Sequence, residues 1–273
     1  MAVKRVNGVE LFYEVNGAGD PLVLVHGSWG DHHNWDPVVP ELSASFRVVT
    51  YDRRGHSRSE RPAGQGSIYD DADDLAGLID ALELGPANLV GNSFGSIVSL
   101  NAAIRRPEVF ATLVVHEPPL LGMLAGTRFE TALHEVNRRT GAVVELLQAG
   151  EDEAGAKQFV ETVAWHPGAW EDELTPEMRD VFTNNAPTFL DEAHDPDWQR
   201  IDLGQLARFD RPALLTKGTV SPPFFASIVD TIGAALPQFR IETIEGAGHS
   251  PHQTTIDQYI ELVRRFVEAA RVA

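Results

Sequence analysis

One short run of small residues, "GNSFG" at positions 91–95, constrains this chain more than any other feature. An apolar run typical of a buried strand precedes it, and a segment of helical periodicity extends from Ser93 to about Arg106. A turn that leads directly from a strand into a helix is so tight that only small residues fit two positions before and two after its centre. The pattern therefore predicts that Ser93 is raised above a sheet edge, with the N-terminus of a helix beneath it, as a candidate nucleophile.

Strands and helices alternate on both sides of this turn, which is typical of a sheet covered by helices on two faces. A hairpin is predicted around Asn7-Gly8. Further strands are predicted at 21–27, 46–52, 87–92, 111–117, 211–218 and 239–246. Helices are predicted at 36–43, 70–84, 93–106, 222–236 and 254–270. The fold class predicted from this order is α/β, with a mostly parallel eight-stranded sheet.

The middle of the chain, residues 120–209, has helical segments and no convincing strand. We therefore predict a core formed by residues 1–119 and 210–273, with residues 120–209 inserted as a helical cap. Within the cap, "TNNAPTF" at 183–189 interrupts the helical pattern at Pro187 and could point Asn184 or Asn185 into a pocket. The cap is also rich in aromatic residues, which either form its own small core or face a substrate. The candidate pocket residues are Trp29, Trp165, Phe182, Asn185 and Phe189.

Composition excludes several classes of partner. The chain has 22 Lys and Arg against 40 Asp and Glu, and its net charge of −18 repels phosphate backbones and anionic membranes. It has no cysteine, which excludes disulfides, thiolate metal sites and a cysteine nucleophile. The polar start of the sequence and the lack of any run of 18 apolar residues predict a soluble, cytoplasmic protein. The expected partner is a small-molecule substrate, and the expected state is a monomer or homodimer.

Three further motifs accompany the serine turn: "HGSWG" at 26–30, "DRRGHSRS" at 52–59 and "GAGHSPH" at 246–252. Together they resemble the α/β-hydrolase fold family over essentially the whole chain. The resemblance implies an oxyanion hole formed by the backbone N–H groups of Ser28 and Phe94, the second of which also follows from the geometry of the turn. It also implies that His249 is the general base for Ser93. The glycines on either side of His249 support this role, because they free its loop to place the imidazole over the strand ends.

A serine–histidine pair needs a third group to orient the imidazole, and in most of the family this group is an aspartate in a Gly-x-x-Asp turn after the next-to-last strand. Here Gly218 is followed by Ser221 at that position, and no carboxylate occurs from 213 to 227. A minority of the family takes its acid from the end of the strand that follows the nucleophile helix, which here is Glu117. Parallel neighbours end at the same sheet edge, so Glu117 is the predicted acid.

Other assignments of the acid stay open at this stage. The site could hold a dyad or an unseen acid, or the protein could have lost hydrolysis. Asp230 and Asp202 are weaker candidates, because they lie within a helix and in the connection from the cap.

The remaining histidines give weaker evidence of a catalytic or metal-binding role. His26 is expected to be a structural hydrogen-bonding group at a strand end. A cluster of His26, His32, His33 and His252 lacks both ligand spacing on a defined helix and a paired carboxylate, so no metal and no cofactor are predicted.

A serine nucleophile argues against the dehalogenases and epoxide hydrolases of this fold, which use aspartate. The expected reaction is hydrolysis of an ester, lactone or thioester with apolar bulk, through an acyl-enzyme on Ser93, His249 and Glu117. A carbon-carbon bond hydrolase, or a cofactor-free haloperoxidase or perhydrolase, would use the same three residues. A non-hydrolytic binder, cyclase or isomerase on this scaffold is the alternative of a different class.

Overall fold

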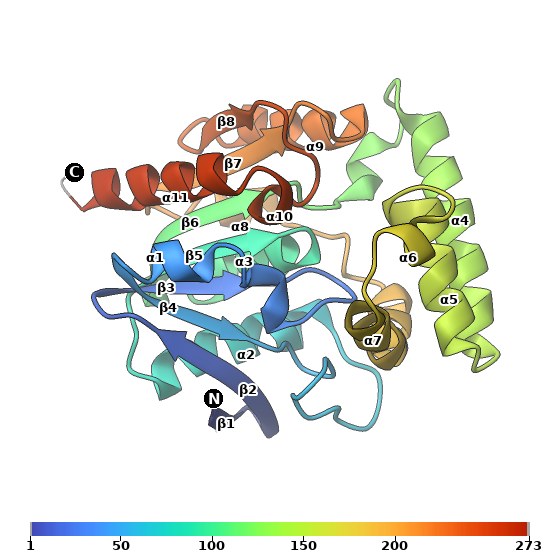
Figure 1. Ribbon diagram of the computed structural model, residues 1–273. Coiled ribbons are helices and arrows are strands. Elements are labelled where there is room, and N and C mark those ends of the chain that lie inside the picture. The colour runs from blue at the N-terminus through green and yellow to red at the C-terminus, as the bar shows by residue number, and fades with distance from the viewer. Residues whose placement is uncertain (1, 272–273) are drawn as a thin grey trace.

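A single sheet forms the centre of the molecule in the computed structural model, which describes residues 2–271 (Figure 1). In this part of the chain the sheet has eight strands in the order β1-β2-β4-β3-β5-β6-β7-β8. The strands are β1 Ala2–Val6, β2 Val9–Asn16, β3 Asp20–Val25, β4 Phe46–Tyr51, β5 Ala87–Asn92, β6 Phe110–His116, β7 Ala213–Gly218 and β8 Arg240–Ile244. Strands β1, β2 and β4 pair antiparallel and all other neighbours pair parallel, which confirms the predicted fold class.

The hairpin at the N-terminus is also confirmed. Val6 pairs with Val9 across a two-residue turn in which Asn7 has a φ of 47° and Gly8 a φ of 82°. Both values are left-handed, as this type of tight hairpin turn requires.

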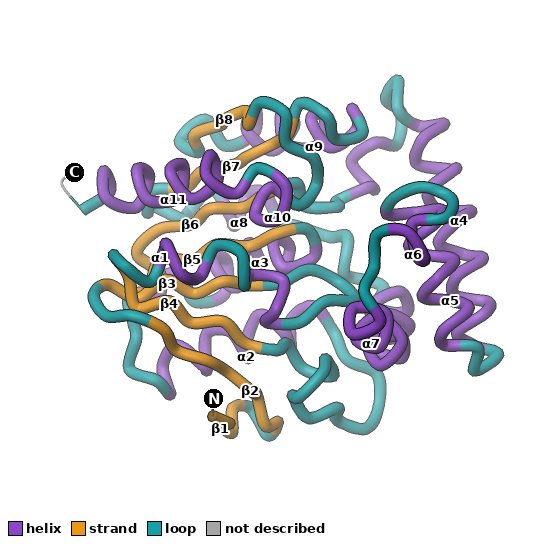
Figure 2. Tube along the Cα trace, in the orientation of Figure 1, coloured by secondary structure: helices purple, strands orange, loops and turns teal. Residues whose placement is uncertain are grey.

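Helices cover both faces of the sheet (Figure 2). The α-helices are α1 Val39–Leu42, α2 Ile68–Ala81, α3 Phe94–Arg105, α4 Glu130–Gln148, α5 Asp152–Phe159, α6 Ala169–Asp172, α7 Pro176–His194, α8 Leu203–Leu206, α9 Pro223–Ala235, α10 Pro251–Thr254 and α11 Ile256–Ala270. Short 3₁₀ segments lie at η1 His32–Trp35, η2 Pro107–Val109 and η3 Leu121–Leu124, and a π-helical turn at η4 Val160–Ala164.

Two apolar clusters sandwich the sheet. Along β3, Val23 and Val25 belong to the cluster beneath α2, α3 and α9, whereas Leu22 and Leu24 belong to the cluster beneath α11. This alternation follows from the period of two in a strand, and it explains why β3 is apolar at every position from Leu22 to Val25.

The cap consists mainly of α4 to α7 and has its own apolar cluster, which includes Val143, Trp170 and Phe189. The ends of the predicted cap segment pack differently. Leu121, near its start, and Phe209, at its end, belong to the larger cluster of the sheet. Most residues of the separate apolar cluster come from α4 to α7, which lie between these two residues.

One sequence-based expectation about helices was wrong, and a second predicted helix is shorter than expected. The interruption predicted at Pro187 does not occur, because α7 continues through it from Pro176 to His194. Proline lacks the N–H that would bond the carbonyl of residue 183, but burial of Ala186 and Phe189 on either side keeps this segment helical. The helix predicted at 36–43 is present only as the single turn α1, Val39–Leu42, and the 3₁₀ segment η1, capped by the Asp31 side chain, precedes it.

Within residues 2–271, no helix is both long enough and apolar enough to cross a bilayer.

Candidate active site

Ser93 occupies the sharp turn that the sequence predicts. Strand β5 ends at Asn92, helix α3 begins at Phe94, and Ser93 between them has φ 56° and ψ −125°. A Cβ on Gly91 would lie 2.6 Å from the Gly95 carbonyl oxygen, and a Cβ on Gly95 would lie 2.2 Å from the Val25 carbonyl oxygen. Both glycines are therefore sterically required, and the strained serine backbone is held by the packing around it.

Glu117 follows the last residue of β6 and is fully buried. Its Oε2 lies 2.8 Å from Nδ1 of His249. The other contacts come from the neighbouring strand end: the backbone N–H of Gly218 donates to Oε1 at 2.8 Å, and the Ser221 hydroxyl donates to Oε2 at 2.9 Å. The serine that replaces the usual aspartate thus bonds directly to the carboxylate predicted in its place.

These contacts determine the charge of Glu117 and the tautomer of His249. Burial alone would raise the pKa of Glu117, but the hydrogen bonds with His249 and with the Gly218 N–H lower it. An ionised carboxylate only accepts hydrogen bonds, so Nδ1 of His249 carries a proton and points it at Glu117. In the neutral imidazole, Nε2 is then free to accept a proton.

The structure brings Glu117 and His249 together, but among the described residues no hydrogen bond joins His249 to Ser93 Oγ. Nucleophile and base are often separated in this way outside the reacting complex.

Three residues around His249 were not identified from the sequence. The Phe225 ring stacks on the imidazole, with centroids 4.4 Å apart, and the Asn92 side-chain amide donates to the His249 carbonyl at 2.8 Å. The third is His116, whose Nε2 lies 3.2 Å from the Gly248 carbonyl oxygen. Asn92 could have been suspected from its place beside Ser93, whereas Phe225 has no signal in the sequence.

His116 is buried, and its contacts fix its state. A carbonyl only accepts, so Nε2 of His116 carries a proton, and Nδ1 lies 3.0 Å from Oγ1 of Thr216, whose hydroxyl is also within 3.2 Å of the Val115 carbonyl oxygen. Burial lowers the pKa of His116 to about 4, which keeps the ring neutral beside the carboxylate of Glu117.

The predicted oxyanion donors lie next to the serine turn. A Cβ on Gly27 would be 3.0 Å from Ser93 Cβ, so the loop of residues 27–30 passes directly beside Ser93. The N–H of Phe94 belongs to the first residue of α3, where backbone N–H groups have no partner within the helix. Ser28 is partly exposed in the same loop. We call residues 27–30 the oxyanion loop below.

The candidate pocket residues divide into two groups. Trp29 and Phe189 stack with centroids 4.5 Å apart inside the cap cluster, and Trp29 is fully buried. The alternative that these residues build the core of the cap therefore describes them better. Trp165 is 44% exposed and lies 6.2 Å, centroid to centroid, from Phe182.

Asn185 does not face a pocket as expected. It is fully buried, and both ends of its amide bond to backbone groups of the core. The reason lies in α7, whose continuation through Pro187 turns this residue toward the core rather than toward a pocket.

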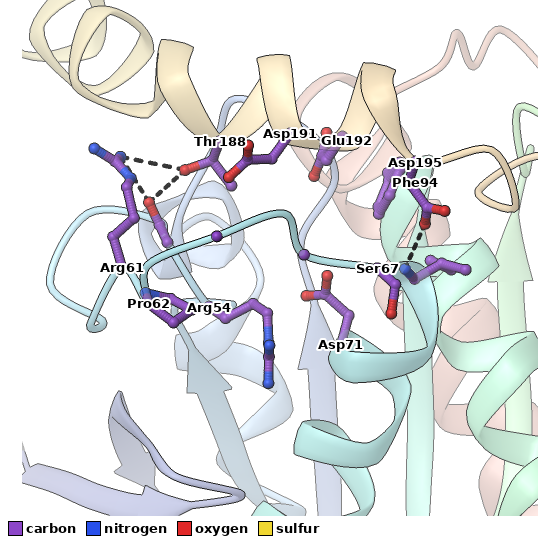
Figure 3. Close-up of a pocket in the computed structure, with 14 residues that line it drawn as sticks. Arg54, Arg61, Pro62, Ser67, Asp71, Phe94, Thr188, Asp191, Glu192 and Asp195 are labelled. Carbon is purple, nitrogen blue, oxygen red and sulfur yellow. Dashed lines mark hydrogen bonds between the residues drawn. The ribbon is translucent and has the colours of Figure 1, made fainter.

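A small cavity lies beneath α7 (Figure 3). Acidic residues of α7 and the loop from Arg54 to Ser67 line it, and Phe94 lies at its edge. Its volume of about 30 Å³ matches the space of about one water molecule, which is too small for an organic substrate.

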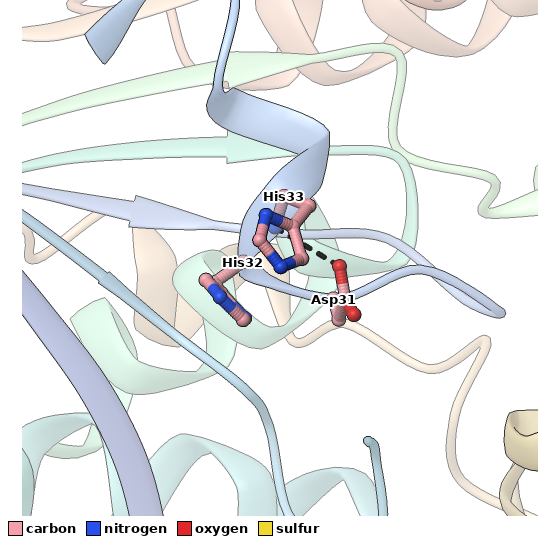
Figure 4. A group of neighbouring side chains, drawn as sticks. All are labelled: Asp31, His32 and His33. Atoms are coloured by element: carbon pink, nitrogen blue, oxygen red, sulfur yellow. Dashed lines mark hydrogen bonds between the residues drawn. The ribbon is translucent and has the colours of Figure 1, made fainter. Parts of the chain in front are cut away.

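Two histidines of the possible metal cluster, His26 and His32, bond to other groups of the core. His26 accepts from the Arg53 N–H at Nε2 and contacts the Gly27 carbonyl with Nδ1, and burial lowers its pKa to about 3. Asp31, His32 and His33 do lie close together (Figure 4). However, His32 Nδ1 bonds to Asp52 at 2.6 Å, and the Asp31 carboxylate caps η1. These contacts stabilise the conformation of the loop that contains the three residues.

The weaker acid candidates lie in other environments. Asp230 pairs with Lys217 at the surface, and Asp202 caps α8 by accepting from the Gln205 N–H at 2.9 Å.

Comparison with known proteins agrees with this architecture. Residues 22–262 match the model of the alpha/beta hydrolase family. An uncharacterised hydrolase of Bacillus subtilis, YraK, is 38% identical over 131 residues, which are 47% of this chain and 48% of the relative. The 2-hydroxymuconate semialdehyde hydrolase of a Pseudomonas species is 43% identical over 115 residues, 40% of each chain. The matches thus span less than half the length of these relatives.

Solved structures extend the similarity in fold to the whole chain. The enol-lactonase of Burkholderia xenovorans has a TM-score of 0.78 at 23% identity, over 98% of this chain and all of that one. A thermophilic esterase of Thermogutta terrifontis has a TM-score of 0.76 at 23% identity, over 99% of both chains. With a family model that covers most of the sequence and a fold that matches throughout, this chain belongs to the alpha/beta hydrolase family of enzymes.

Proposed function

We propose that the protein hydrolyses a carboxylic ester, lactone or thioester with apolar bulk, through an acyl-enzyme on the triad Ser93, His249 and Glu117. The observation that carries this proposal is the buried Glu117 carboxylate, bonded to Nδ1 of His249 at 2.8 Å. A buried carboxylate in this position orients the imidazole and stabilises the imidazolium that forms during acyl transfer.

In the proposed reaction, Ser93 Oγ attacks the substrate carbonyl carbon while Nε2 of His249 takes the hydroxyl proton. The backbone N–H groups of Ser28 and Phe94 donate to the oxyanion of the tetrahedral intermediate. Collapse of the intermediate breaks the bond to the alcohol or thiol, which leaves with the proton from His249. A water molecule then attacks the acyl-enzyme with His249 as base, which releases the acid and restores Ser93.

A carbon-carbon bond hydrolase on the same residues is the second candidate, and the curated relatives favour it. Besides the 2-hydroxymuconate semialdehyde hydrolase, the 2-hydroxy-6-oxo-2,4-heptadienoate hydrolase of Pseudomonas putida is 44% identical over 115 residues, 40% of this chain and 41% of that one. The esterase and enol-lactonase with the same fold support the first candidate.

The test is labelling of the protein with a fluorophosphonate, read by intact mass, followed by a panel of p-nitrophenyl esters of increasing acyl length, lactones, thioesters and a vinylogous diketone. We expect one adduct on the wild type, none on Ser93→Ala, and turnover of esters that is lost in the same variant. Turnover of the diketone alone would favour the second candidate. An unlabelled wild type would favour a non-hydrolytic binder, cyclase or isomerase.

A further inference from the structure

Helix α7 of the cap turns a row of buried polar side chains toward the core. Asn185, Thr188 and Glu192 are spaced by three and four residues, so they lie on one face of the helix. All three are buried, with exposed fractions of 0%, 7% and 8%. Figure 3 shows Thr188 and Glu192 on the underside of α7, above the loop that carries Arg54 and Arg61. Buried polar groups are almost always hydrogen-bonded, so each of these side chains is expected to have a defined partner in the core.

Asn185 bonds to the backbone of the oxyanion loop. Its Nδ2 donates to the carbonyl oxygens of Trp29 and Gly30, both at 3.0 Å, and its Oδ1 accepts from the Ser57 N–H at 2.7 Å. Carbonyls can only accept and a backbone N–H can only donate, so the orientation of the amide is fixed by its partners. One cap side chain thus bonds to two of the four carbonyls of the oxyanion loop.

Glu192 reaches the same loop through Arg53. The guanidinium of Arg53 is buried and donates from Nη2 both to Glu192 Oε1 and, at 3.3 Å, to the Gly27 carbonyl. Nη1 donates to Asp71 of α2 at 3.1 Å. The cap therefore bonds directly to the last two residues of the oxyanion loop and is connected to its first residue through Arg53.

The side chain of Trp29 forms a further contact between the oxyanion loop and the cap. Trp29 belongs to the apolar cluster of the cap, where Phe159 and Phe189 lie 4.9 and 4.5 Å from its ring. Its φ of 67° is left-handed, a conformation that costs a bulky residue free energy and persists only where surrounding contacts impose it.

We propose that the cap positions the oxyanion hole: Asn185, assisted by the Arg53–Glu192 pair, holds the oxyanion loop so that the Ser28 N–H points at the reacting carbonyl oxygen. Asn185 is a positioning residue, since it acts through the backbone of residues 29 and 30. The inference rests on the proposed function, in which that N–H stabilises the oxyanion.

Thr188 supplies a matched control. Its hydroxyl donates to the Gly55 carbonyl and accepts from Arg61, so Thr188 also attaches α7 to the core, but through residues outside the oxyanion loop. Asn185→Leu removes the bonds to the oxyanion loop and Thr188→Val removes only an attachment of the cap. A role limited to attaching the cap would give the two variants the same kinetics.

The experiment compares both variants with the wild type on the best p-nitrophenyl ester, together with inhibition by an alkyl boronic acid as a transition-state analogue. We expect Asn185→Leu to lower kcat by about 10- to 100-fold with KM changed less than about twofold, and to weaken the boronic acid by a similar factor. Thr188→Val should keep kcat within about threefold of the wild type. Equal kcat for wild type and Asn185→Leu would overturn the proposal.

Amide hydrogen exchange of a peptide spanning 26–30 gives a readout that needs no substrate. Exchange should accelerate about tenfold or more in Asn185→Leu and stay unchanged in Thr188→Val. Unchanged exchange in both variants would overturn the inference, whether or not the proposed function holds. A wild-type protein that hydrolyses no substrate of the panel would count against the proposed function alone. If Asn185→Leu does not fold, Asn185→Asp is the second variant. It keeps the shape of the side chain and the bond from Ser57, but it places a carboxylate against two carbonyl oxygens. We expect the same fall in kcat and the same faster exchange.

Discussion

Glu117 and Ser93 share an uncommon backbone conformation, with φ values of 45° and 56°. Such left-handed values are strained for residues with a side chain, and they occur where the surrounding structure imposes them. The Glu117 N–H donates to the Thr216 carbonyl at 3.2 Å, and the Ser93 N–H donates to the His116 carbonyl at 3.0 Å. The strand ends thus hold both backbones in place.

A first prediction concerns the location of the acid. Glu117→Gln keeps the shape of the side chain but removes its charge, so kcat should fall by about 10³- to 10⁴-fold. The Ser221 hydroxyl bonds to the same carboxylate oxygen that contacts His249. Adding Ser221→Asp should therefore return a carboxylate to the reach of Nδ1 and recover about tenfold or more of the lost kcat. Steady-state kinetics on one ester decide this, and wild-type turnover in Glu117→Gln would show that the acid is elsewhere.

A second prediction concerns His252, which is buried against Trp35 with ring centroids 4.3 Å apart. Burial lowers the pKa of His252 to about 3 from a usual value of 6.5. Between these two pH values the unfolded chain binds a proton that the folded chain does not, so this residue costs stability as the pH falls below 6.5. At pH 4 the cost should be about 3 kcal/mol.

His252→Phe removes this titration and keeps an aromatic ring in the site. The free energy of unfolding of the variant minus that of the wild type should therefore rise by about 3 kcal/mol between pH 7 and pH 4. Urea titrations at the two pH values measure it. An equal pH profile for His252→Phe and wild type would mean that His252 is charged in the folded state.

At the scale of elements, α7 shows what a local pattern can and cannot predict. Its start is readable from the sequence, because Thr175 caps the helix and Pro176 occupies its first turn. Pro187 is equally evident in the sequence and predicts a break in the helix, but burial of neighbouring positions keeps the segment helical. Asn185 could not be placed correctly, because its direction depends on the helix continuing and on partners more than 120 residues away in sequence.

The same helix gives a third prediction. Pro187 leaves one helical hydrogen bond unmade, so Pro187→Ala should raise the free energy of unfolding by about 1–2 kcal/mol, after allowance for the greater freedom of the unfolded chain. Pro176→Ala is the matched change, because a proline in the first turn loses no hydrogen bond and its replacement should bring no gain. Thermal and urea unfolding of both variants would measure the effects. A Pro187→Ala protein less stable than wild type would show that the ring of Pro187 contributes more by packing than it costs.

For the molecule as a whole, the site is assembled at one edge of the parallel sheet. Ser93 follows β5 and Glu117 follows β6, while Ser221 and His249 lie in the loops after β7 and β8. Their proximity was predictable, since parallel strands end at a common edge. The connections between cap and core were not, because they join segments such as 53 and 192 whose pairing leaves no trace in local periodicity.

The last prediction concerns how much the connections between cap and core contribute to the free energy of unfolding. The chain has many ion pairs, but most lie at the surface, where such a pair contributes about 0–1 kcal/mol. The Arg53–Glu192 pair is different, since its side chains are 1% and 7% exposed and it joins the cap to the core. Glu192→Leu leaves the guanidinium buried with only Asp71 opposite it, so the free energy of unfolding should fall by about 3 kcal/mol. Arg138→Ala, which removes an exposed pair with Glu135, should change the free energy of unfolding far less than Glu192→Leu does, because water screens this pair. Urea unfolding measures both, and similar small changes in the two variants would mean that water reaches Arg53 and that packing alone holds the cap in place.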